Sequence, residues 1–394
     1  MQKNGANQTR GQEKNRGLVL STLQHLKLCS RAELAKQTAL KQATITYIIN
    51  DFIKWGLVEE TGLLAGEKGR RSIGVRFSEK KYRVIGFRLT RQYYTIGVFS
   101  LDGTEDSQRV FKPIEDTNPT LILETVCETI NQMIDSQPDK TFLAVGVAVP
   151  GPYYADTGEI AVISSFPGWK NIKIREIMQE KISIPTIIEH DANAGALAES
   201  YLAADRSVYD TMVYISAGQG IGAGVLNTGA IYSGSLGVAG EIGHTCIDMN
   251  GPQCDCGGRG CLTLYASTIA LVEKVRSAKA DQTLSFQDVV SLINKNDTDA
   301  AGVFREVMRY LSIGIVNIIY SYNPRLIVIG DEMSRIGPQV LDEIRSNIKK
   351  MNATRLSDQI DIQLARMEDD SAYLGSAVIA SHYVFKNVAR FFDD

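Results

Sequence analysis

The stretch TMVYISAGQGIGAGVLNTGAIYSG, residues 211–234, decides the fold, because it carries two strand-like apolar runs around a glycine-rich turn. The segment VIGFRLTRQYYTIGVFSLDGT, residues 84–104, repeats the plan and closes at an Asp-Gly turn. Two halves that each begin with a β-hairpin around a predicted phosphate loop indicate an internal duplication. The chain from about residue 82 to 394 is therefore expected to be an α/β body with two lobes.

Segments between and around these hairpins support the α/β class. Residues 118–136 have the apolar periodicity of an amphipathic helix, and residues 142–153 combine a buried strand with a rigid Pro-Gly-Pro turn. In TIIEHDANAGALAES, residues 186–200, a strand ends at a carboxylate and an alanine-rich helix follows. Alternation of strands and helices is the sequence signature of this class.

Length and composition narrow the range of functions. The 394 residues are enough for two or three domains, and 44% hydrophobic with 22% charged residues is typical of a globular protein. No apolar run reaches the roughly 18 residues needed to span a membrane, and the polar N-terminus lacks the apolar core of a secretory signal. We therefore expect a cytoplasmic protein without a membrane partner, in which clustered cysteines serve as metal ligands.

The charge is unevenly distributed along the chain. Residues 1–76 contain 13 Lys and Arg against 6 Asp and Glu, a net charge of +7, whereas the rest contains 29 against 39, a net charge of −10. A basic N-terminal piece on an acidic body is typical of a nucleic-acid-binding arm.

The pattern within the basic piece predicts a winged helix-turn-helix domain over residues 1–80. Apolar residues recur at helical spacing from Leu18 to Leu28, and Ser30 with Glu33 forms the sequence of a capping box. After a short break at 38–40, a third helix places Ile45, Ile48, Ile49 and Phe52 on one face. Two strand-like runs around a Gly- and Arg-rich tip follow in residues 56–77 and predict a wing.

The polar face of the third helix and the wing tip are the predicted DNA contacts. In a helix-turn-helix the second helix enters the major groove, and a basic wing reaches the minor groove or the phosphates. An ordinary helical subdomain with a hairpin is the alternative, but the charge, turn, polar face and basic tip all favour DNA binding. The predicted contacts are Lys41, Gln42, Thr44, Thr46, Tyr47, Arg70 and Arg71.

Five motifs in the body resemble the ROK family of repressors, open reading frames and kinases. They are VAVPGP, EHDANAGALAE, GQGIGAGVLNTGAIYSGSLGVAGEIGH, CDCGGRGC and YNPRLIVIG, and they occur in this order over nearly the whole chain. The resemblance implies a two-lobed actin-like ATPase fold over residues 82–394, shared by sugar kinases and by sugar-responsive repressors. Members of the repressor branch respond to xylose, N-acetylglucosamine or glucose, and they carry an N-terminal winged helix like the one predicted here.

A metal site is predicted in HTCIDMNGPQCDCGGRGC, residues 244–261. The resemblance implies that the family's structural zinc ligands correspond to His244, Cys254, Cys256 and Cys261. One imidazole and three thiolates form a closed tetrahedral Zn²⁺ site with no open position for catalysis. The alternative is a set of reduced structural cysteines. Cys246 is left over and is expected to pack as a small apolar residue.

The resemblance also implies a sugar cleft. His190, Asp191, Glu241 and His244 match the family's sugar-contacting positions, and Asp191 matches the base that deprotonates the sugar hydroxyl in the kinases. By itself, an Asp before an alanine-rich helix is also a common N-cap. Two positions depart from the kinases: His190 replaces an asparagine, and Thr263 replaces a glutamate after the last zinc cysteine. These changes leave the identity of the sugar open.

The nucleotide side of the cleft has lost its family pattern. Arg88 replaces the Asp of the first phosphate loop, Thr90 and Arg91 replace its glycines, and Gln92 replaces its Thr. Gln219 interrupts the second loop, where the family usually has Thr or an apolar residue. Asp331 and Glu332 replace glycines after VIG, residues 328–330. Without backbone amides and a metal-holding Asp to bind ATP, phosphoryl transfer is not expected, and Asp191 is a vestigial base.

The sequence thus predicts a transcriptional regulator, most simply a repressor of carbohydrate uptake or metabolism genes and not an enzyme. Its expected partners are double-stranded operator DNA, a sugar or sugar-phosphate effector, and further copies of the chain in a homodimer or tetramer. Two alternatives remain open: an active sugar kinase with an added DNA-binding arm, and a regulator controlled by a protein partner.

Overall fold

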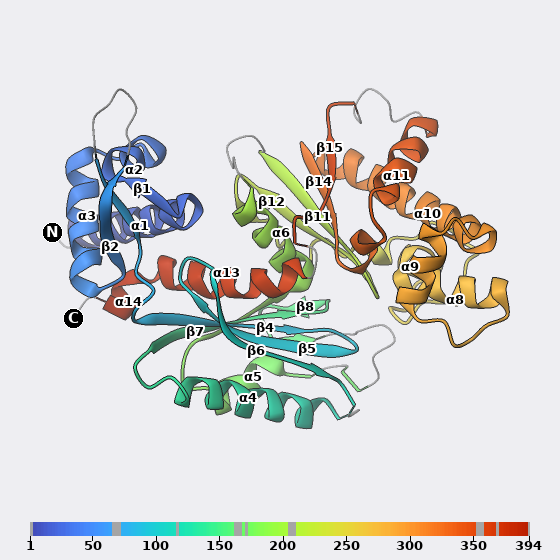
Figure 1. The fold of residues 1–394 in the computed structure, drawn as a ribbon, viewed down its shortest axis with the longest axis horizontal. Coiled ribbons are helices and arrows are strands. Elements are labelled where there is room, and N and C mark those ends of the chain that lie inside the picture. Colours follow the sequence, from blue (N-terminus) through green and yellow to red (C-terminus); the bar gives the residue numbers. More distant parts are fainter. Residues whose placement is uncertain are drawn as a thin grey trace.

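The computed structural model describes residues 3–64, 72–115, 118–160, 168–169, 172–203, 210–351, 358–367 and 370–392, with side chains from residue 10 onward. Figure 1 shows a helical N-terminal part, a sheet with helices beneath it, and a second sheet with helices on its far side. The predicted class, a winged helix followed by a two-lobed α/β body, is confirmed. No described helix has both the length and the apolarity required to cross a membrane.

The N-terminal part is a winged helix. Its three-stranded sheet has the order β1-β3-β2, with antiparallel pairing throughout. Because Lys27 has φ 62°, the first helix ends there, and Leu28 lies in a strand paired with Arg76 and not in the helix that its spacing predicted. The tip of the wing, with Arg70 and Arg71, lies outside the described residues. The elements are α1 (Lys3–Leu26), β1 (Leu28–Ser30), α2 (Arg31–Thr38), α3 (Gln42–Trp55), β2 (Val58–Leu64) and β3 (Ser72–Phe77).

Lobe I follows the winged helix and forms a five-stranded sheet. The strand order is β10-β7-β4-β5-β6, in which β7 pairs in parallel with both β4 and β10. Helices α4 and α5 cover the lower face in Figure 1. The elements are β4 (Tyr82–Leu89), β5 (Tyr93–Ser100), β6 (Glu105–Pro113), α4 (Pro119–Asp135), β7 (Thr141–Val149), β8 (Tyr153–Tyr154), β9 (Glu159–Ile160), α5 (Ile174–Lys181) and β10 (Thr186–His190). Helix α6 (Asp191–Leu202) follows β10 and crosses to pack on the sheet of the second lobe.

Lobe II repeats the strand order of lobe I, which confirms the predicted duplication. The order β13-β12-β11-β14-β15 corresponds to β6-β5-β4-β7-β10, with the hairpin antiparallel and the last three strands parallel in each sheet. The elements are β11 (Thr211–Ala217), β12 (Ile221–Asn227), β13 (Ala230–Ile231), a 3-10 turn at Ile242–His244, α7 (Thr263–Ala266), α8 (Thr268–Lys279), α9 (Phe286–Asn294), α10 (Thr298–Tyr322), β14 (Leu326–Gly330), a 3-10 turn at Glu332–Ile336, α11 (Gln339–Lys350) and β15 (Asp361–Leu364).

The chain ends with α13 (Ser371–Lys386) and α14 (Val388–Phe392), which return to the winged helix. Helix α13 packs on β4, β7 and α6, and Figure 1 shows it running from the middle of the body toward the N-terminal part. Its far end packs against α1, where Phe385 stacks on Phe77 of the wing with ring centroids 5.7 Å apart. One apolar core therefore joins the winged helix to α13 and α6.

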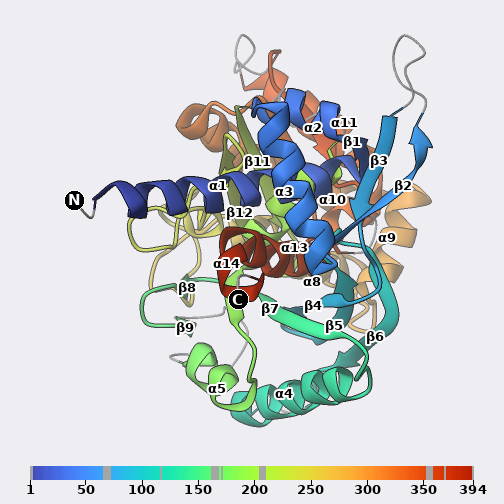
Figure 2. The same cartoon turned by 90° about the vertical axis from the view of Figure 1, so that its left-hand side faces the viewer.

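The first helix crosses α13 at a point where only glycine fits. A Cβ on Gly17 would lie 2.4 Å from the carbonyl oxygen of Phe385, whereas a Cβ on Gly11 would meet nothing within 4 Å. In Figure 2 the N-terminal end of α1 projects beyond the rest of the molecule. The contact at Gly17 therefore sets how closely the winged helix approaches the body.

We expect Gly17→Ala to destabilise the protein by about 1–3 kcal/mol, because the added methyl group overpacks the crossing of α1 with α13. Gly11→Ala in the same helix is the matched control, and it should be neutral or stabilise the helix by up to about 1 kcal/mol. Thermal midpoints from calorimetry of the two variants and the parent chain provide the comparison. Equal midpoints for Gly17→Ala and Gly11→Ala would show that the two helices do not meet as described.

Candidate effector cleft and metal centre

The four predicted sugar contacts line one cleft between the lobes. His190 ends β10 and Asp191 begins α6 in lobe I, while Glu241 and His244 belong to the segment after β13 in lobe II. Thr263, at the start of α7, lines the same cleft. His190 occupies the N-cap position of α6 and Asp191 is the first helical residue, so the N-cap reading of Asp191 is wrong by one position.

His190 links the carboxylates of the two lobes. Its Nε2 lies 3.2 Å from Asp191 Oδ1 and 3.8 Å from Glu241 Oε1, and its side chain is only 8% exposed. Burial disfavours the imidazolium, but the charges of Glu241, Asp191 and Glu189 outweigh it and raise the pKa of His190.

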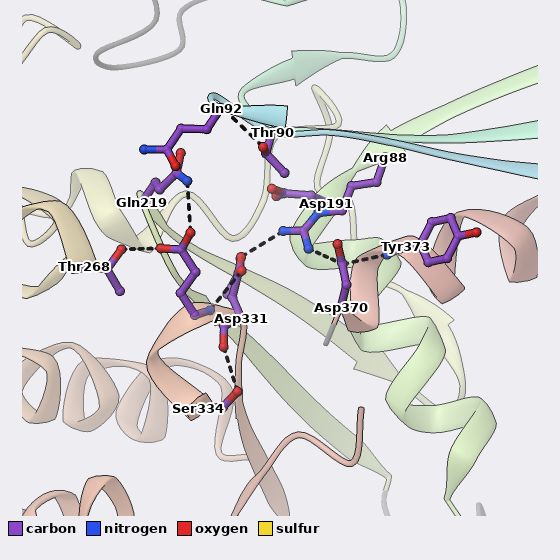
Figure 3. Close-up of polar contacts among 12 residues, drawn as sticks. Arg88, Thr90, Gln92, Asp191, Gln219, Thr268, Asp331, Ser334, Asp370 and Tyr373 are labelled. Carbon is purple, nitrogen blue, oxygen red and sulfur yellow. Dashed lines mark hydrogen bonds and ion pairs between the residues drawn. The ribbon is translucent and has the colours of Figure 1, made fainter. Parts of the chain in front are cut away.

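On the nucleotide side, Arg88 of β4 lies between two carboxylates (Figure 3). Its Nη2 is 3.0 Å from Asp331 Oδ2, and its Nη1 forms an ion pair with Asp370, the N-cap of α13. Burial opposes the charged guanidinium, but the attraction of Asp370 and Asp331 raises the pKa of Arg88. The position that holds a metal-binding Asp in the kinases therefore holds a buried cation, neutralised by residues of the chain itself.

The two carboxylates respond to Arg88 differently. Burial raises the pKa of Asp331, but Arg88 and the hydroxyl of Ser216, which donates to Asp331 Oδ2 at 2.8 Å, lower it further, so the net shift is downward. For Asp370 burial prevails over Arg88, and its pKa is raised. The ion pair between Asp331 and Arg88 connects lobe II to lobe I.

Hydrogen bonds within the chain occupy the two turns that the sequence matched to phosphate loops. In the β4–β5 turn, the backbone amides of Gln92 and Tyr93 donate to the hydroxyl of Thr90 at 3.2 and 3.0 Å. In lobe II, Glu332 accepts from Gln219 at 3.0 Å and from Thr268 at 2.5 Å. Donors that would bind phosphate in an ATP site thus already have acceptors here.

Arg91 lies over the second loop. A Cβ on Gly220 would come 2.7 Å from its Nη2, so the guanidinium lies against that glycine. Burial lowers the pKa of Arg91 despite the nearby charges of Asp191, Asp331, Glu332 and Glu241. With both arginines in place, the cavity between the lobes is only about 50 Å3.

The predicted metal ligands converge on one point. The ligand atoms of His244, Cys254, Cys256 and Cys261 all lie within 4.8 Å of one another. Cys254 Sγ is 3.6 Å from His244 Nδ1, and Cys256 Sγ is 3.6 Å from Cys261 Sγ. Tetrahedral Zn²⁺ with bonds of about 2.3 Å to sulfur places two thiolates about 3.8 Å apart, so the cluster fits a metal ion of this kind.

Two further observations concern this segment. Burial raises the pKa of Cys261 to about 12, and a bound cation would reverse that shift by favouring the thiolate. Cys246 is exposed, which corrects the expectation that it packs as a small apolar residue. It lies outside the cluster, although its backbone bridges to that of Cys261.

The predicted DNA contacts that the structure describes lie on the outer face of the winged helix. Ile45, Ile48, Ile49 and Phe52 of α3 are buried, as the spacing predicted. Lys41, Gln42 and Thr46 are exposed, Thr44 is half-buried, and Tyr47 is 61% exposed. Helix α3 is held by Arg16 of α1, which binds Asp51 at 2.7 Å and lies over Trp55.

Sequence reasoning located Arg88, Asp331 and Glu332 in the nucleotide region but missed their partners. Asp370 carried no recognisable signal, because an Asp before a helix is the commonest N-cap pattern. Ser216 and Thr268 were missed for a similar reason, since each is an ordinary residue within or beside a strand or helix. A buried Arg in place of a metal-binding Asp was the one available hint that carboxylates must lie nearby.

Comparisons with known proteins identify the family. The chain is 29% identical over 380 residues to the xylose repressor of Bacillus subtilis (strain 168), covering 96% of this chain and 98% of the repressor. It is 28% identical over 360 residues to the DNA-binding transcriptional dual regulator NagC of Escherichia coli (strain K12), covering 89% and 88% of the two chains.

Among solved structures, the fold matches that of a ROK family transcriptional regulator, a homologue of the E. coli MLC protein. The TM-score is 0.77 at 24% identity, and the match covers 96% of this chain and 97% of the other. The sequence model of the ROK family matches residues 84–383. The chain therefore belongs to the ROK family.

Proposed function

We propose that this protein is a transcriptional repressor of carbohydrate uptake or metabolism genes whose hold on operator DNA is controlled by a sugar or sugar phosphate. Residues 1–80 bind DNA, residues 82–394 form the effector-binding body, and residues 244–261 form its metal segment. The protein acts in the cytoplasm as a homodimer or tetramer, because a palindromic operator requires two recognition helices. The names of its relatives, a xylose repressor and a DNA-binding transcriptional regulator, support this function.

The observation that carries the proposal is an exposed recognition helix on a body whose cleft keeps three of the sugar-contacting positions but has a buried ion pair where the kinases bind the nucleotide. The sugar side keeps Asp191, Glu241 and His244 facing one another across the lobes. On the nucleotide side, Arg88 is neutralised by Asp331 and Asp370. A cleft of this kind can bind a sugar but lacks the means to bind ATP and magnesium.

Phosphoryl transfer is not part of this function. In the kinases an Asp holds magnesium and glycine amides bind phosphate, whereas Arg88 would repel the metal and Thr90 already binds the amides of its turn. Asp191 therefore contacts a sugar hydroxyl without a phosphoryl donor to complete the reaction.

We further propose that the four-residue cluster holds one structural Zn²⁺. The donor set of three thiols and one imidazole suits Zn²⁺ and leaves no open position for catalysis. With Nδ1 of His244 at the cysteines and the ring lining the cleft, the metal would orient the imidazole toward the sugar.

The DNA-binding role predicts that Tyr47→Ala lowers affinity for the operator about 5- to 150-fold, because a lost base contact costs about 1–3 kcal/mol. Lys54→Ala is the control: Lys54 is exposed near the other end of α3 and should affect all sequences alike. Fluorescence anisotropy at fixed salt, with an operator selected from randomised duplexes and a scrambled duplex, measures both effects. If Tyr47→Ala keeps the parent's preference for operator over scrambled DNA, α3 is not the recognition helix.

For the metal, we expect one zinc per chain in the purified protein and a loss of most of it in Cys256→Ser, since a structural site needs all four ligands. Cys246→Ser removes a neighbouring exposed cysteine outside the cluster and should retain zinc. Elemental analysis of the three proteins gives the result. A wild-type chain without zinc, or equal loss in both variants, would contradict the ligand set.

For the effector, we expect Asp191→Asn to leave DNA affinity within twofold but to abolish sugar-induced release, because the amide replaces a charged acceptor of the sugar hydroxyl. D-xylose, D-glucose, N-acetyl-D-glucosamine and their phosphates are screened for release of operator from the wild-type protein, and the active compound is titrated into the variant. Asp139→Asn, an exposed carboxylate of lobe I, is the control and should respond like the wild type. If Asp191→Asn and Asp139→Asn release the operator at the same sugar concentration, the effector binds elsewhere.

A further inference from the structure

We propose that the ion pair between Arg88 and Asp331 is a brace between the lobes: it replaces the bound nucleotide as their connection, and an effector must break it to enter. The idea that its release frees DNA rests on the proposed function above. The brace itself rests on the contacts of the described residues alone.

The lobes share an apolar core through α6 and α13, and the brace adds a polar connection between them across the cleft. Arg88 belongs to β4 of lobe I and Asp331 follows β14 of lobe II, 243 residues later in the chain. Both side chains are buried, at 4% and 12% exposure, so water screens their attraction weakly. Breaking the pair would deprive Asp331 of its cation while Arg88 kept Asp370, and that cost favours one arrangement of the lobes.

The backbone at Asp331 provides a second, independent observation. Its angles, φ 63° and ψ −158°, fall in a region that is populated almost entirely by glycine and costs other residues about 1–3 kcal/mol. The family has glycine here, yet this chain keeps an Asp in a strained conformation. Such strain persists where the surrounding contacts hold the residue in place, and Arg88 and Ser216 are those contacts.

The braced cleft has little room for a ligand. Its cavity of about 50 Å3 is well below the roughly 300 Å3 of a typical ligand pocket. Arg88 and Arg91 extend into this space from the β4–β5 hairpin, facing Asp331, Glu332 and Glu241 of lobe II. A sugar therefore needs the lobes to part, and parting them separates Arg88 from Asp331.

Parting the lobes would change the position of lobe II relative to the winged helix. The winged helix moves with lobe I, because Gln24 of α1 donates to the carbonyl of Leu101 at 2.8 Å and α14 stacks Phe392 on Trp55 of α3. Asp370, the second partner of Arg88, caps α13, which spans about 24 Å from the cleft to the wing.

A groove leaves space for this movement. A cavity of about 1030 Å3 separates α1 of the winged helix from the β12–β13 hairpin of lobe II. Arg10, Lys14 and Leu18 line one wall, and Leu226, Thr228 and Ile231 line the other. The width of this groove depends on the angle between the lobes. In a dimer joined through one lobe of each copy, a change in that angle would also change the spacing of the two recognition helices.

The test measures the groove directly, without DNA or sugar. Lys14 and Asn227, which are both exposed, are replaced by p-acetylphenylalanine and spin-labelled there, so that the cysteines are not modified. Pulsed electron paramagnetic resonance then gives the distance between the two labels. We expect one narrow distance in the parent chain and a shifted or broadened distribution in Asp331→Asn, which removes the charge but keeps the shape. Glu306→Gln is the matched control, because it breaks the ion pair with Lys274 inside lobe II, and its distribution should match the parent's.

Asp331→Gly covers the case in which Asp331→Asn does not fold, because glycine adopts the backbone angles of this position without strain. The proposal of a brace is wrong if the distance distribution of the Asp331 variants matches that of the parent chain. It is also wrong if Glu306→Gln changes the distribution equally. A second experiment uses the sugar that releases DNA from the wild type. This sugar should release DNA from Asp331→Asn at a concentration at least about fivefold lower, which is within the usual range of coupling between two sites. Failure of DNA binding in this arm counts against the proposed function, while the groove distance still decides the brace.

Discussion

A buried guanidinium between two carboxylates governs the arrangement of this protein's cleft. Arg88 reaches Asp331 of lobe II and Asp370 at the start of α13, so one side chain joins the two lobes and the helix that leads to the winged helix. A charge buried this deeply is tolerated only when it is paired and hydrogen-bonded. The surrounding polar residues, including Ser216, are positioned to satisfy that requirement.

The same interaction stands where an ATP-binding member of the fold would need a different arrangement of charges. In an ATP site, negative phosphates and a metal ion connect the lobes, so the protein supplies amides, glycines and a metal-binding Asp. Here a cation from lobe I and a carboxylate from lobe II provide the complementary charges. Elsewhere in the cleft, His190 lies between the carboxylates of Asp191 and Glu241, apart from this ion pair.

The cluster of His244 and three cysteines and helix α13 connect the cleft to other parts of the molecule. His244 belongs both to the four-residue cluster and to the lining of the cleft, so the cysteine-rich segment positions one of its walls. Helix α13 leaves the other side and ends against α1 and the wing, where Gly17 allows close contact. Each feature is a local packing requirement, and together they make the cleft the centre of a connected structure.

The sequence alone determined the elements that follow from local patterns: the duplicated hairpins, the buried face of α3 and the spacing of His244 with the three cysteines. Periodicity, turn residues and ligand spacing are properties of short segments, so they can be read without knowing the fold. The predictions from sequence were wrong for Leu28, whose strand pairing depends on distant residues, and for Cys246, whose exposure does. Only the tertiary structure decided that Arg88 meets Asp331 and Asp370, because the charge of a buried residue is neutralised by whichever side chains the fold brings to it, and these lie more than 240 residues away.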